Sequence, residues 1–326
     1  FDAIFETNFG ADLTIMEEGF ELISRIKNKG TLPMITSCSP GWIKFIEHFF
    51  PKSLDHLSTC KSPQQMFGAV AKTYYAEKLN VDPRKIVVVS IMPCTAKKFE
   101  CKRPEMKSAF HYWKEKLNLP EKDSFFDVDY VLTTRELARM FKVTGIDFSN
   151  LPEEDFDHPL GISTGAGVIF GATGGVMEAA VRTAYEVITG KPLDKIELNV
   201  LRGFEGIKEA ELDLNGTKLR VAVAHTLKNA RVLLEQIEEG TSPYAFIEVM
   251  TCPGGCLGGG GQPIPTTWAI RQKRSDSLYK EDRLKPIRKS HENPAIKAIY
   301  DDFLKEPLGH VSHELLHTDY IERGIY

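Results

Sequence analysis

The chain has 326 residues, of which 42% are apolar and 26% are charged, and its formal net charge at pH 7 is −4. This length and composition are typical of a soluble globular protein with about two domains or lobes. A net charge so close to zero argues against a nucleic-acid partner, which needs a basic face. No apolar run approaches the roughly 20 residues of a membrane-spanning helix.

The N-terminal sequence FDAIFETNFGAD has neither the basic region nor the apolar region of a signal peptide. It begins in an apolar segment without an initiator methionine, so we expect a fragment or a processed chain. The missing signal is therefore weak evidence about the compartment.

The first predicted elements are a helix and a strand. Residues 12–29 have an amphipathic pattern, and Gly30 stands at the C-cap position that would close the helix. LPMIT, at 32–36, is predicted to be a short buried strand that leads into TSCSPGW at 36–42.

A second helix and strand follow. Residues 62–79 predict a helix in which Ser62 and Gln65 form a capping box and Pro63 takes the first helical position. The apolar, β-branched run at 86–92 predicts a strand that is covered on both faces and ends in PCTAKKFE.

The middle of the chain alternates in the same way. Residues 128–132 predict a strand, and Thr133 and Glu136 predict a capping box for the helix after it. Residues 171–191 predict a helix with a glycine-rich entry that stops at Gly190.

The last third predicts a hairpin, a strand and a helical tail. Asn215-Gly216 is the turn signal of a hairpin over 211–224. Residues 244–250 predict a strand that runs into TCPGGCLGGGGQP, and the chain from about 275 is polar with a helical pattern. The expected fold class is α/β.

The six cysteines do not form a disulfide framework, which is a feature of small secreted domains. Cys60 and Cys101 are expected to be buried thiols. Cys38, Cys94 and Cys252 each follow a predicted strand and lie in a loop broken by Pro or Gly. Ligand sites of open α/β sheets lie beyond the carboxyl ends of strands, so these three loops are predicted to share a site.

The loops suggest iron–sulfur chemistry, because thiolates are soft ligands that suit zinc or iron–sulfur clusters. The glycines around Cys252 and Cys256 would let main-chain amides approach a bulky inorganic group, although a flexible glycine-rich turn is the alternative. Lys97, three residues after Cys94, could direct its charge at an anionic ligand, or could be a solvent-exposed lysine in the first turn of a helix.

Three charged residues of the first helix share one face. Glu18, Glu21 and Arg25 are spaced i, i+3 and i+7. Such carboxylates could relay protons to a buried site, or could form a solvated face with a Glu–Arg pair.

The segments TSCSPGW, MPCTAKKFE and EVMTCPGGCLGGGGQP together resemble the three signature segments of the [FeFe]-hydrogenases, TSCCPxW, MPCxxKxxE and ExMxCxxGCxxGGGQP, in the same order. The resemblance continues through ADLTIMEEG, STCKSPQQM and GAGVIFGATGGVMEAA, and the tail resembles the C-terminal belt of the family, in some members a separate small subunit. It implies residues 1–270 as the catalytic domain, truncated at its N-terminus relative to the family, and 271–326 as the helical belt.

The resemblance implies a fold of two lobes, each a small mixed or parallel sheet flanked by helices, with the cofactor buried between them. That cofactor, the H-cluster, is a [4Fe–4S] cubane joined to a two-iron unit with CO, cyanide and dithiolate ligands, and the implied reaction interconverts protons, electrons and H₂. The implied metal ligands are Cys94, Cys252, Cys256 and Ser39. The implied cofactor-binding residues are Lys97, Met92, Pro93, Met250, Ser62, Gln64 and Phe170. The implied proton route comprises Cys38, Glu18, Ser58, Glu21 and Arg25.

Two segments depart from the family pattern. The signature has two adjacent cysteines, and Ser39 takes the place of the second, which ligates the cubane. A serine oxygen is a harder and far less acidic donor than a thiolate, so either the cluster is weakened or Cys38 replaces it as ligand. Residues 108–126 resemble an insertion whose helix would pack on the surface and contact a partner.

The resemblance also implies partners and a location. Electrons would come from ferredoxin or another iron–sulfur carrier or subunit, since only Cys60 and Cys101 remain for further clusters. Maturation proteins would supply the cofactor, and the expected location is the cytoplasm. The alternative, favoured by Ser39, is a non-catalytic relative that senses H₂ or assists iron–sulfur assembly, and a plain zinc or iron–sulfur module ranks last.

Overall fold

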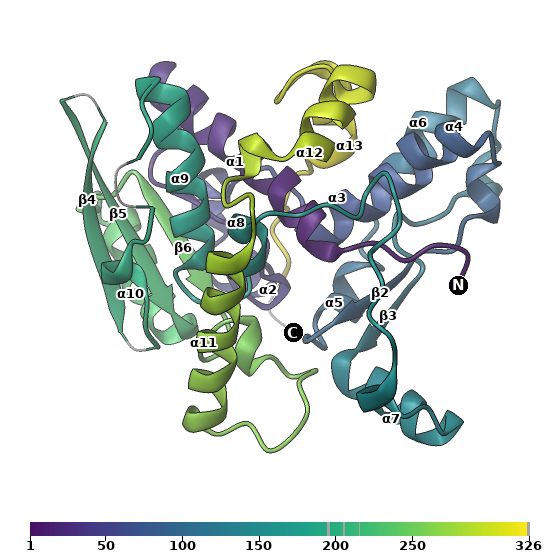
Figure 1. The fold of residues 1–326 in the computed structure, drawn as a ribbon. Coiled ribbons are helices and arrows are strands. Elements are labelled where there is room, and N and C mark those ends of the chain that lie inside the picture. Colours follow the sequence, from purple (N-terminus) through teal and green to yellow (C-terminus); the bar gives the residue numbers. More distant parts are fainter. Residues whose placement is uncertain (194–195, 205, 215, 325–326) are drawn as a thin grey trace.

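A computed structural model of the chain describes residues 1–193, 196–204, 206–214 and 216–324. It has two sheets on opposite sides of the molecule, with α1 (Thr7–Lys27), α8 (Gly165–Ile169) and α11 (Trp268–Leu284) between them (Figure 1). None of the described helices is both long enough and apolar enough to cross a membrane. The predicted α/β class with two small sheets is confirmed.

The larger sheet has four strands in the order β1-β6-β5-β4. β6 is parallel to both β1 and β5, and β4 is antiparallel to β5. The strands of this sheet are β1 (Met34–Ile35), β4 (Ile207–Leu214), β5 (Thr217–His225) and β6 (Phe246–Met250).

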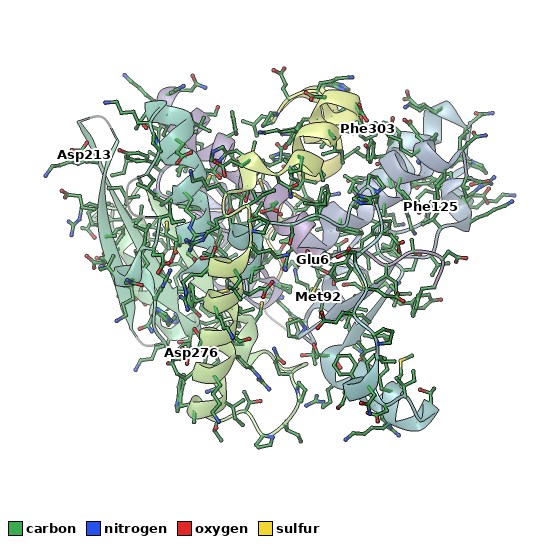
Figure 2. All side chains as sticks on the ribbon, viewed as in Figure 1. Glu6, Met92, Phe125, Asp213, Asp276 and Phe303 are labelled. Atoms are coloured by element: carbon green, nitrogen blue, oxygen red, sulfur yellow. The ribbon has the colours of Figure 1, made fainter. Side chains whose placement is uncertain are left out.

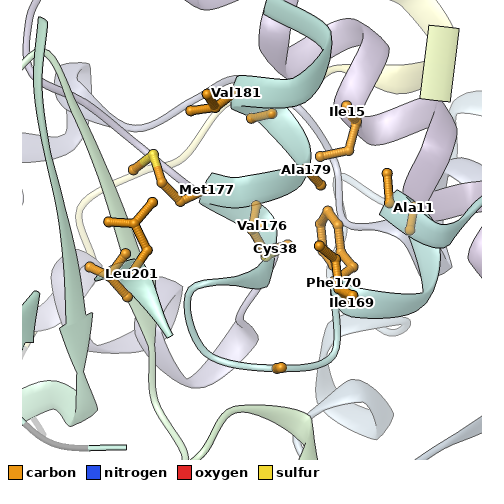
Figure 3. Packing of buried hydrophobic residues seen from close by; sticks show 14 of the residues in the cluster. Ala11, Ile15, Cys38, Ile169, Phe170, Val176, Met177, Ala179, Val181 and Leu201 are labelled. Atoms are coloured by element: carbon orange, nitrogen blue, oxygen red, sulfur yellow. The ribbon is translucent and has the colours of Figure 1, made fainter. Parts of the chain in front are cut away.

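Side chains of alternating direction bury both faces of this sheet. Phe246 and Met250 of β6 belong to a core with α1, α8 and α9 (Gly175–Thr189), whereas Ile247 and Val249 belong to a core with α2 (Pro40–Phe49) and α10 (Thr226–Glu238). Figure 3 shows part of the first core, which includes Cys38.

The smaller lobe contains two parallel strands and several helices. β2 (Val89–Met92) pairs with β3 (Tyr130–Thr133), and only a small apolar cluster covers them. The helices on this side are α3 (Pro63–Val70), a π-helical turn (Ala71–Tyr75), α4 (Ala76–Leu79), α5 (Lys97–Glu100), α6 (Ser108–Lys116) and α7 (Thr134–Thr144).

The C-terminal segment is helical, as predicted. After α11 come α12 (Pro294–Ile299), a π-helical turn (Tyr300–Leu304) and α13 (His310–Leu316). Ile296, Ile299 and Leu315 pack with Phe9 and Leu13 of α1 in a third core. A boundary at 270/271 would fall in the first turn of α11, and the division into domains stays a proposal.

Three predictions of helix boundaries are wrong. α1 begins at Thr7 rather than near residue 12, because it is buried against both lobes and does not need a solvent-facing stripe. The left-handed residue at its end is Lys29 (φ 56°), whereas Gly30 donates its N–H to the Arg25 carbonyl, as the last residue of a Schellman motif. α9 begins at Gly175, and 165–169 form the separate helix α8.

The capping box predicted at Ser62 is also wrong. Ser62 is the N-cap of α3 and Pro63 follows it as predicted, but the Ser62 hydroxyl donates to Glu100 Oε2 (2.8 Å). The side-chain N and O atoms of Gln65 have no hydrogen-bond partner among the described residues. The Ser62 hydroxyl thus binds Glu100, a residue of another segment, instead of forming the capping box with Gln65.

The other predictions of caps, strands and turns are confirmed in part. The capping box of Thr133 and Glu136 and the stop at Gly190 (φ 65°) are confirmed. The strand predicted at 86–92 is shorter, and it is not covered on both faces, since three of its four residues are only partly buried. The hairpin is confirmed as β4–β5, although Asn215 lies outside the described residues.

The surface helix predicted in 108–126 corresponds to α6. α6 buries Ala109 and Phe110 and contacts α3 and α13, and the indole N–H of Trp113 donates to the Lys72 carbonyl (2.7 Å). Its contact with a partner stays a prediction.

Candidate functional site

The cysteine loops follow the ends of three strands, as predicted. Cys38 comes three residues after β1, and Cys94 and Cys252 come two residues after β2 and β6. β1 and β6 are parallel neighbours, so their carboxyl ends leave the same edge of the larger sheet. Met92, the last residue of β2, lies in the middle of the molecule, between the two lobes (Figure 2).

Direct contacts join the three loops. The hydroxyls of Ser39 and Thr251 are 2.8 Å apart. Lys97 Nζ donates to the Cys38 carbonyl (3.0 Å), and the Gly261 N–H donates to the Pro93 carbonyl (3.0 Å). The loops of both lobes therefore form one site.

Glycine is required where the backbones of two loops touch. A Cβ on Gly259 would lie 2.0 Å from the Pro93 carbonyl oxygen, and one on Gly261 would lie 2.7 Å from the Cys94 nitrogen. The Cys256 N–H donates to the Gly171 carbonyl (2.9 Å). The glycine run is thus a closely packed segment rather than a flexible turn.

We expect Gly259→Ala to destabilise the protein by about 1–3 kcal/mol, because overpacking displaces the loop that carries Cys94. Gly19→Ala is the control: an added Cβ in α1 would meet nothing within 4 Å, and alanine should stabilise a helix by about 0.5–1 kcal/mol. Urea unfolding of the cluster-free proteins measures both changes, and iron content after reconstitution should fall only for Gly259→Ala. Equal stability of this variant and the wild type would contradict the packing argument.

The thiols of three cysteines lie close enough to affect one another. Burial, followed by the charge of Cys94, raises the pKa of Cys256 to about 12. The same two causes raise the pKa of Cys252. Thiolates gathered in this way need a compensating cation, which a metal cluster supplies.

Lys97 is buried, so the alternative of a solvent-exposed lysine is wrong. Its ammonium group lies 2.9 Å from Glu100 Oε2. Ser62 and Gln64 also donate to this oxygen, at 2.8 and 3.3 Å. Three of the predicted cofactor-binding residues therefore converge on a carboxylate that the sequence analysis did not assign.

Three of the four apolar residues predicted to line the cofactor are also buried. Met250 and Phe170 belong to the core that includes Cys38, and Met92 belongs to the small cluster under β2. Pro93 is partly exposed, and its carbonyl accepts the hydrogen bond from Gly261.

The carboxylates of α1 are buried rather than solvated, with Glu18 only 1% and Glu21 only 7% exposed. Glu21 accepts the Ser58 hydroxyl (2.8 Å) and forms an ion pair with Arg25 (2.6 Å). Arg25 also donates to the Leu57 carbonyl (2.6 Å). Four of the five residues predicted for proton transfer thus occupy one segment of α1 and the loop beside it.

Glu18 is the least satisfied carboxylate of this group. Neither of its oxygens has a hydrogen-bond partner among the described residues. Burial, reinforced by the charge of Glu21, raises its pKa to about 8. Cys38 lies nearby: burial, followed by the charge of Glu18, raises the pKa of its thiol well above the ordinary value.

Two further residues of the site, besides Glu100, were not predicted from the sequence. Glu248, inside β6, accepts the N–H groups of Gly174 and Met177 (both 2.7 Å) at the start of α9, and burial raises its pKa to about 7. Thr251 binds Ser39. Glu248 could have been found from the sequence, because it is a charged residue inside an otherwise apolar strand. No local pattern marks Thr251.

A family model of the iron-only hydrogenase large subunit, C-terminal domain, matches residues 1–260, and one of the iron hydrogenase small subunit matches residues 269–323. The chain belongs to the iron-only hydrogenase family. The cysteines, Lys97 and the carboxylates of the site described above therefore lie in the region that the first family model matches.

Similar proteins agree with this assignment. The chain is 52% identical over 99% of its length to NADP-reducing hydrogenase subunit HndD of Solidesulfovibrio fructosivorans, and 45% identical over 98% to iron hydrogenase 1 of Clostridium pasteurianum. It spans 54% of each of these relatives, about half their length. It is 30% identical over 97% of its length to a cytosolic Fe–S cluster assembly factor of Xenopus tropicalis, of which it covers 66%.

A solved structure has the same fold. An apo variant of [FeFe]-hydrogenase HydA1 from Chlamydomonas reinhardtii superposes with a TM-score of 0.83 at 44% identity, and the match covers 100% of this chain and 86% of that one.

Proposed function

We propose that the chain is the catalytic part of an [FeFe]-hydrogenase and interconverts H₂ with protons and electrons at a bound H-cluster. The observation that carries this proposal is the gathering of Cys94, Cys252 and Cys256 beside the buried Lys97, next to the carboxylates of α1. When bound, the H-cluster supplies the iron chemistry that makes and splits H₂.

The donor set fits such a cluster in three of its four positions. Thiolates are soft donors that suit iron, and a bound cluster would compensate the charge that burial disfavours at Cys252 and Cys256. The residues that would hold the cluster are Cys94, Cys252 and Cys256. Lys97 would donate to a cyanide ligand, and Met92, Pro93, Met250, Ser62, Gln64 and Phe170 would line the pocket.

The fourth ligand position would fall to Ser39. Its hydroxyl is bound to Thr251 (2.8 Å), which keeps the oxygen at the junction of the loops that carry Cys38 and Cys252. Oxygen is a harder donor than thiolate, so we infer a more weakly held cluster than one with four cysteines. Cys38 is the alternative ligand, and it would then be lost as a proton donor.

Protons would move through the residues of α1 and the adjoining loop. Cys38 would hold a thiol proton beside the cofactor site, and Glu18 would supply protons to Cys38 through water, since its pKa of about 8 keeps it protonated at neutral pH. Ser58 donates to Glu21 and could pass a proton by reorienting its hydroxyl. Arg25, with its side chain 14% exposed, would mark the exit to solvent.

Electrons would come from another iron–sulfur protein or domain, and we propose a ferredoxin-type carrier. Support comes from the cysteine inventory: only Cys60 and Cys101 remain, and both are buried. The name of the relative HndD, an NADP-reducing hydrogenase subunit, fits an electron-carrier partner of some kind. Maturation proteins would insert the cofactor, and we propose a cytoplasmic location.

We also propose that residues 1–270 form the catalytic domain and that 271–326 form a belt that stabilises it. The packing of α12 against α1, and of α13 against α3 and α6, supports this arrangement.

A non-catalytic sensor or assembly factor is the second candidate, and Ser39 is the specific observation in its favour. The identity to an assembly factor is 30%, against 45% and 52% to hydrogenases, so catalysis is the stronger proposal.

Anaerobic maturation followed by infrared spectroscopy tests the cofactor. We expect the CO and cyanide stretching bands of an H-cluster, together with H₂ production from reduced methyl viologen. A folded, matured protein without these bands would contradict the proposal, whereas bands without H₂ production would favour the non-catalytic candidate.

A further inference from the structure

A buried histidine of the C-terminal segment contacts the loop that serves the proton route. His317 follows α13, and its side chain is 1% exposed. One ring nitrogen, Nδ1, lies 2.7 Å from the Thr59 hydroxyl, and the other, Nε2, lies 3.0 Å from Glu17 Oε2. A neutral imidazole with its proton on Nε2 satisfies both contacts, since it donates to Glu17 and accepts from Thr59.

Thr59 in turn belongs to the surroundings of Glu21. Its backbone N–H points at both oxygens of Glu21, at 3.2 and 3.1 Å, beside the hydrogen bond from Ser58. Glu17 and Glu21 are one turn apart on α1. The contacts therefore close a ring from Glu17 through His317 and Thr59 to Glu21.

The backbone reinforces this ring. The Thr318 N–H donates to the Thr59 carbonyl (2.8 Å), and the Lys61 N–H donates to the Leu316 carbonyl (2.8 Å). The backbone pairing fixes the distance between the two segments, and the hydrogen bond to His317 fixes the Thr59 side chain. Glu17 is held independently, because the Leu308 N–H (2.9 Å) and the Tyr300 hydroxyl also donate to it.

We propose that His317 is a positioning residue for proton transfer: through Thr59 it holds the Ser58 hydroxyl and the Thr59 amide on Glu21. This inference rests on the proposed function and assigns a role in it to the C-terminal segment. A proton route tolerates little displacement, because proton transfer needs donor and acceptor within hydrogen-bond reach. Packing alone would not require both imidazole nitrogens to be engaged.

Two conservative variants separate positioning from packing. Asparagine can imitate Nδ1 of histidine, so His317→Asn should keep the hydrogen bond with Thr59 and lose the one with Glu17. Glutamine can imitate Nε2, so His317→Gln should keep the hydrogen bond with Glu17 and lose the one with Thr59. Thr59→Val removes the same hydrogen bond from the other side with little change of shape, and Tyr300→Phe is the control because Tyr300 contacts Glu17 but not Thr59.

For the matured enzymes we expect kcat for H₂ production to fall about tenfold in His317→Gln and in Thr59→Val, with an unchanged KM for reduced methyl viologen and a larger solvent isotope effect. His317→Asn and Tyr300→Phe should keep kcat within about twofold of the wild type. The double variant Thr59→Val/His317→Gln should be no slower than the slower single variant, since both remove one interaction. A wild-type kcat in His317→Gln, or additive losses in the double variant, would overturn the inference.

Amide hydrogen exchange of the cluster-free proteins tests the same contact without any activity. Exchange at Thr59 should be faster in His317→Gln and Thr59→Val than in the wild type, and unchanged in His317→Asn. Equal exchange in wild type and His317→Gln would overturn the inference. A matured wild type that makes no H₂ would instead contradict the proposed function, and the exchange result would still decide the role of His317.

Discussion

Replacing Glu18 by glutamine is expected to lower H₂ production by about two to four orders of magnitude, the usual contribution of a positioned proton donor. Glutamine keeps the shape of the side chain but cannot carry and release a proton. The measurement is kcat with reduced methyl viologen, supported by infrared spectra that verify equal cofactor content.

A buried carboxylate elsewhere on the same helix provides the control. Asp12 accepts hydrogen bonds from Thr164, Ser290 and Asn293 and lies outside the proposed route. Asp12→Asn should therefore reduce stability but leave kcat of the folded enzyme unchanged. A wild-type kcat in Glu18→Gln would exclude Glu18 from proton transfer.

The same substitution has an effect on stability that does not depend on the cofactor. The pKa of Glu18 is raised from 4.5 to about 8 in the folded protein, so between these values the folded state binds more protons than the unfolded state. The stability that wild type has relative to Glu18→Gln is therefore fully present below pH 4.5 and is lost as the pH rises toward 8.

Urea unfolding of the cluster-free proteins at pH 5 and pH 9 measures this change. The difference in unfolding free energy should move in favour of glutamine by up to a few kcal/mol, since one pKa unit corresponds to about 1.4 kcal/mol. A difference that is independent of pH would show that Glu18 titrates normally.

Replacing Ser39 by cysteine should raise both iron retention and H₂ turnover. The substitution adds a fourth soft ligand at the junction of two cysteine loops, at the cost of the hydrogen bond to Thr251, which is worth about 1 kcal/mol. Iron per chain after desalting and the cubane signal in electron paramagnetic resonance measure iron retention, and kcat measures turnover.

Ser39→Ala completes the comparison, because it removes the hydroxyl without adding a thiol. If Ser39 ligates the cubane, alanine should retain less iron than serine. Equal iron retention in all three forms would mean that Cys38 is the ligand or that three thiolates suffice. Cys38→Ala in the Ser39 background would then lose iron only in the first case.

Much of the site could be predicted locally. Cys38, Cys94 and Cys252 were predicted to follow apolar strands, and the structure confirms each of these places. The capping box at Thr133 was predicted for the same reason: both partners lie within one turn of a helix. Patterns of this kind need no information about distant segments.

The predictions that were wrong concern competition between local and distant partners. Ser62 has the sequence context of a capping residue, yet its hydroxyl binds Glu100, 38 residues away. α1 extends to Thr7 because the two lobes bury it from both sides, and its amphipathic pattern is correspondingly weak. Local propensities amount to about 1 kcal/mol or less, so apolar burial and the cost of an unpaired buried polar group outweigh them.

The sequence by itself therefore determined the class of the fold, the strand ends that carry the cysteines, and the resemblance to a family. Only the tertiary structure decided which distant partners the buried polar groups have: Glu100 for Ser62, Thr251 for Ser39, and His317 for Thr59. The physical reason is that strand and helix patterns depend on neighbours along the chain. The partner of a buried polar group is instead whichever group folding brings within hydrogen-bond reach, because an unpaired polar atom in the interior is costly.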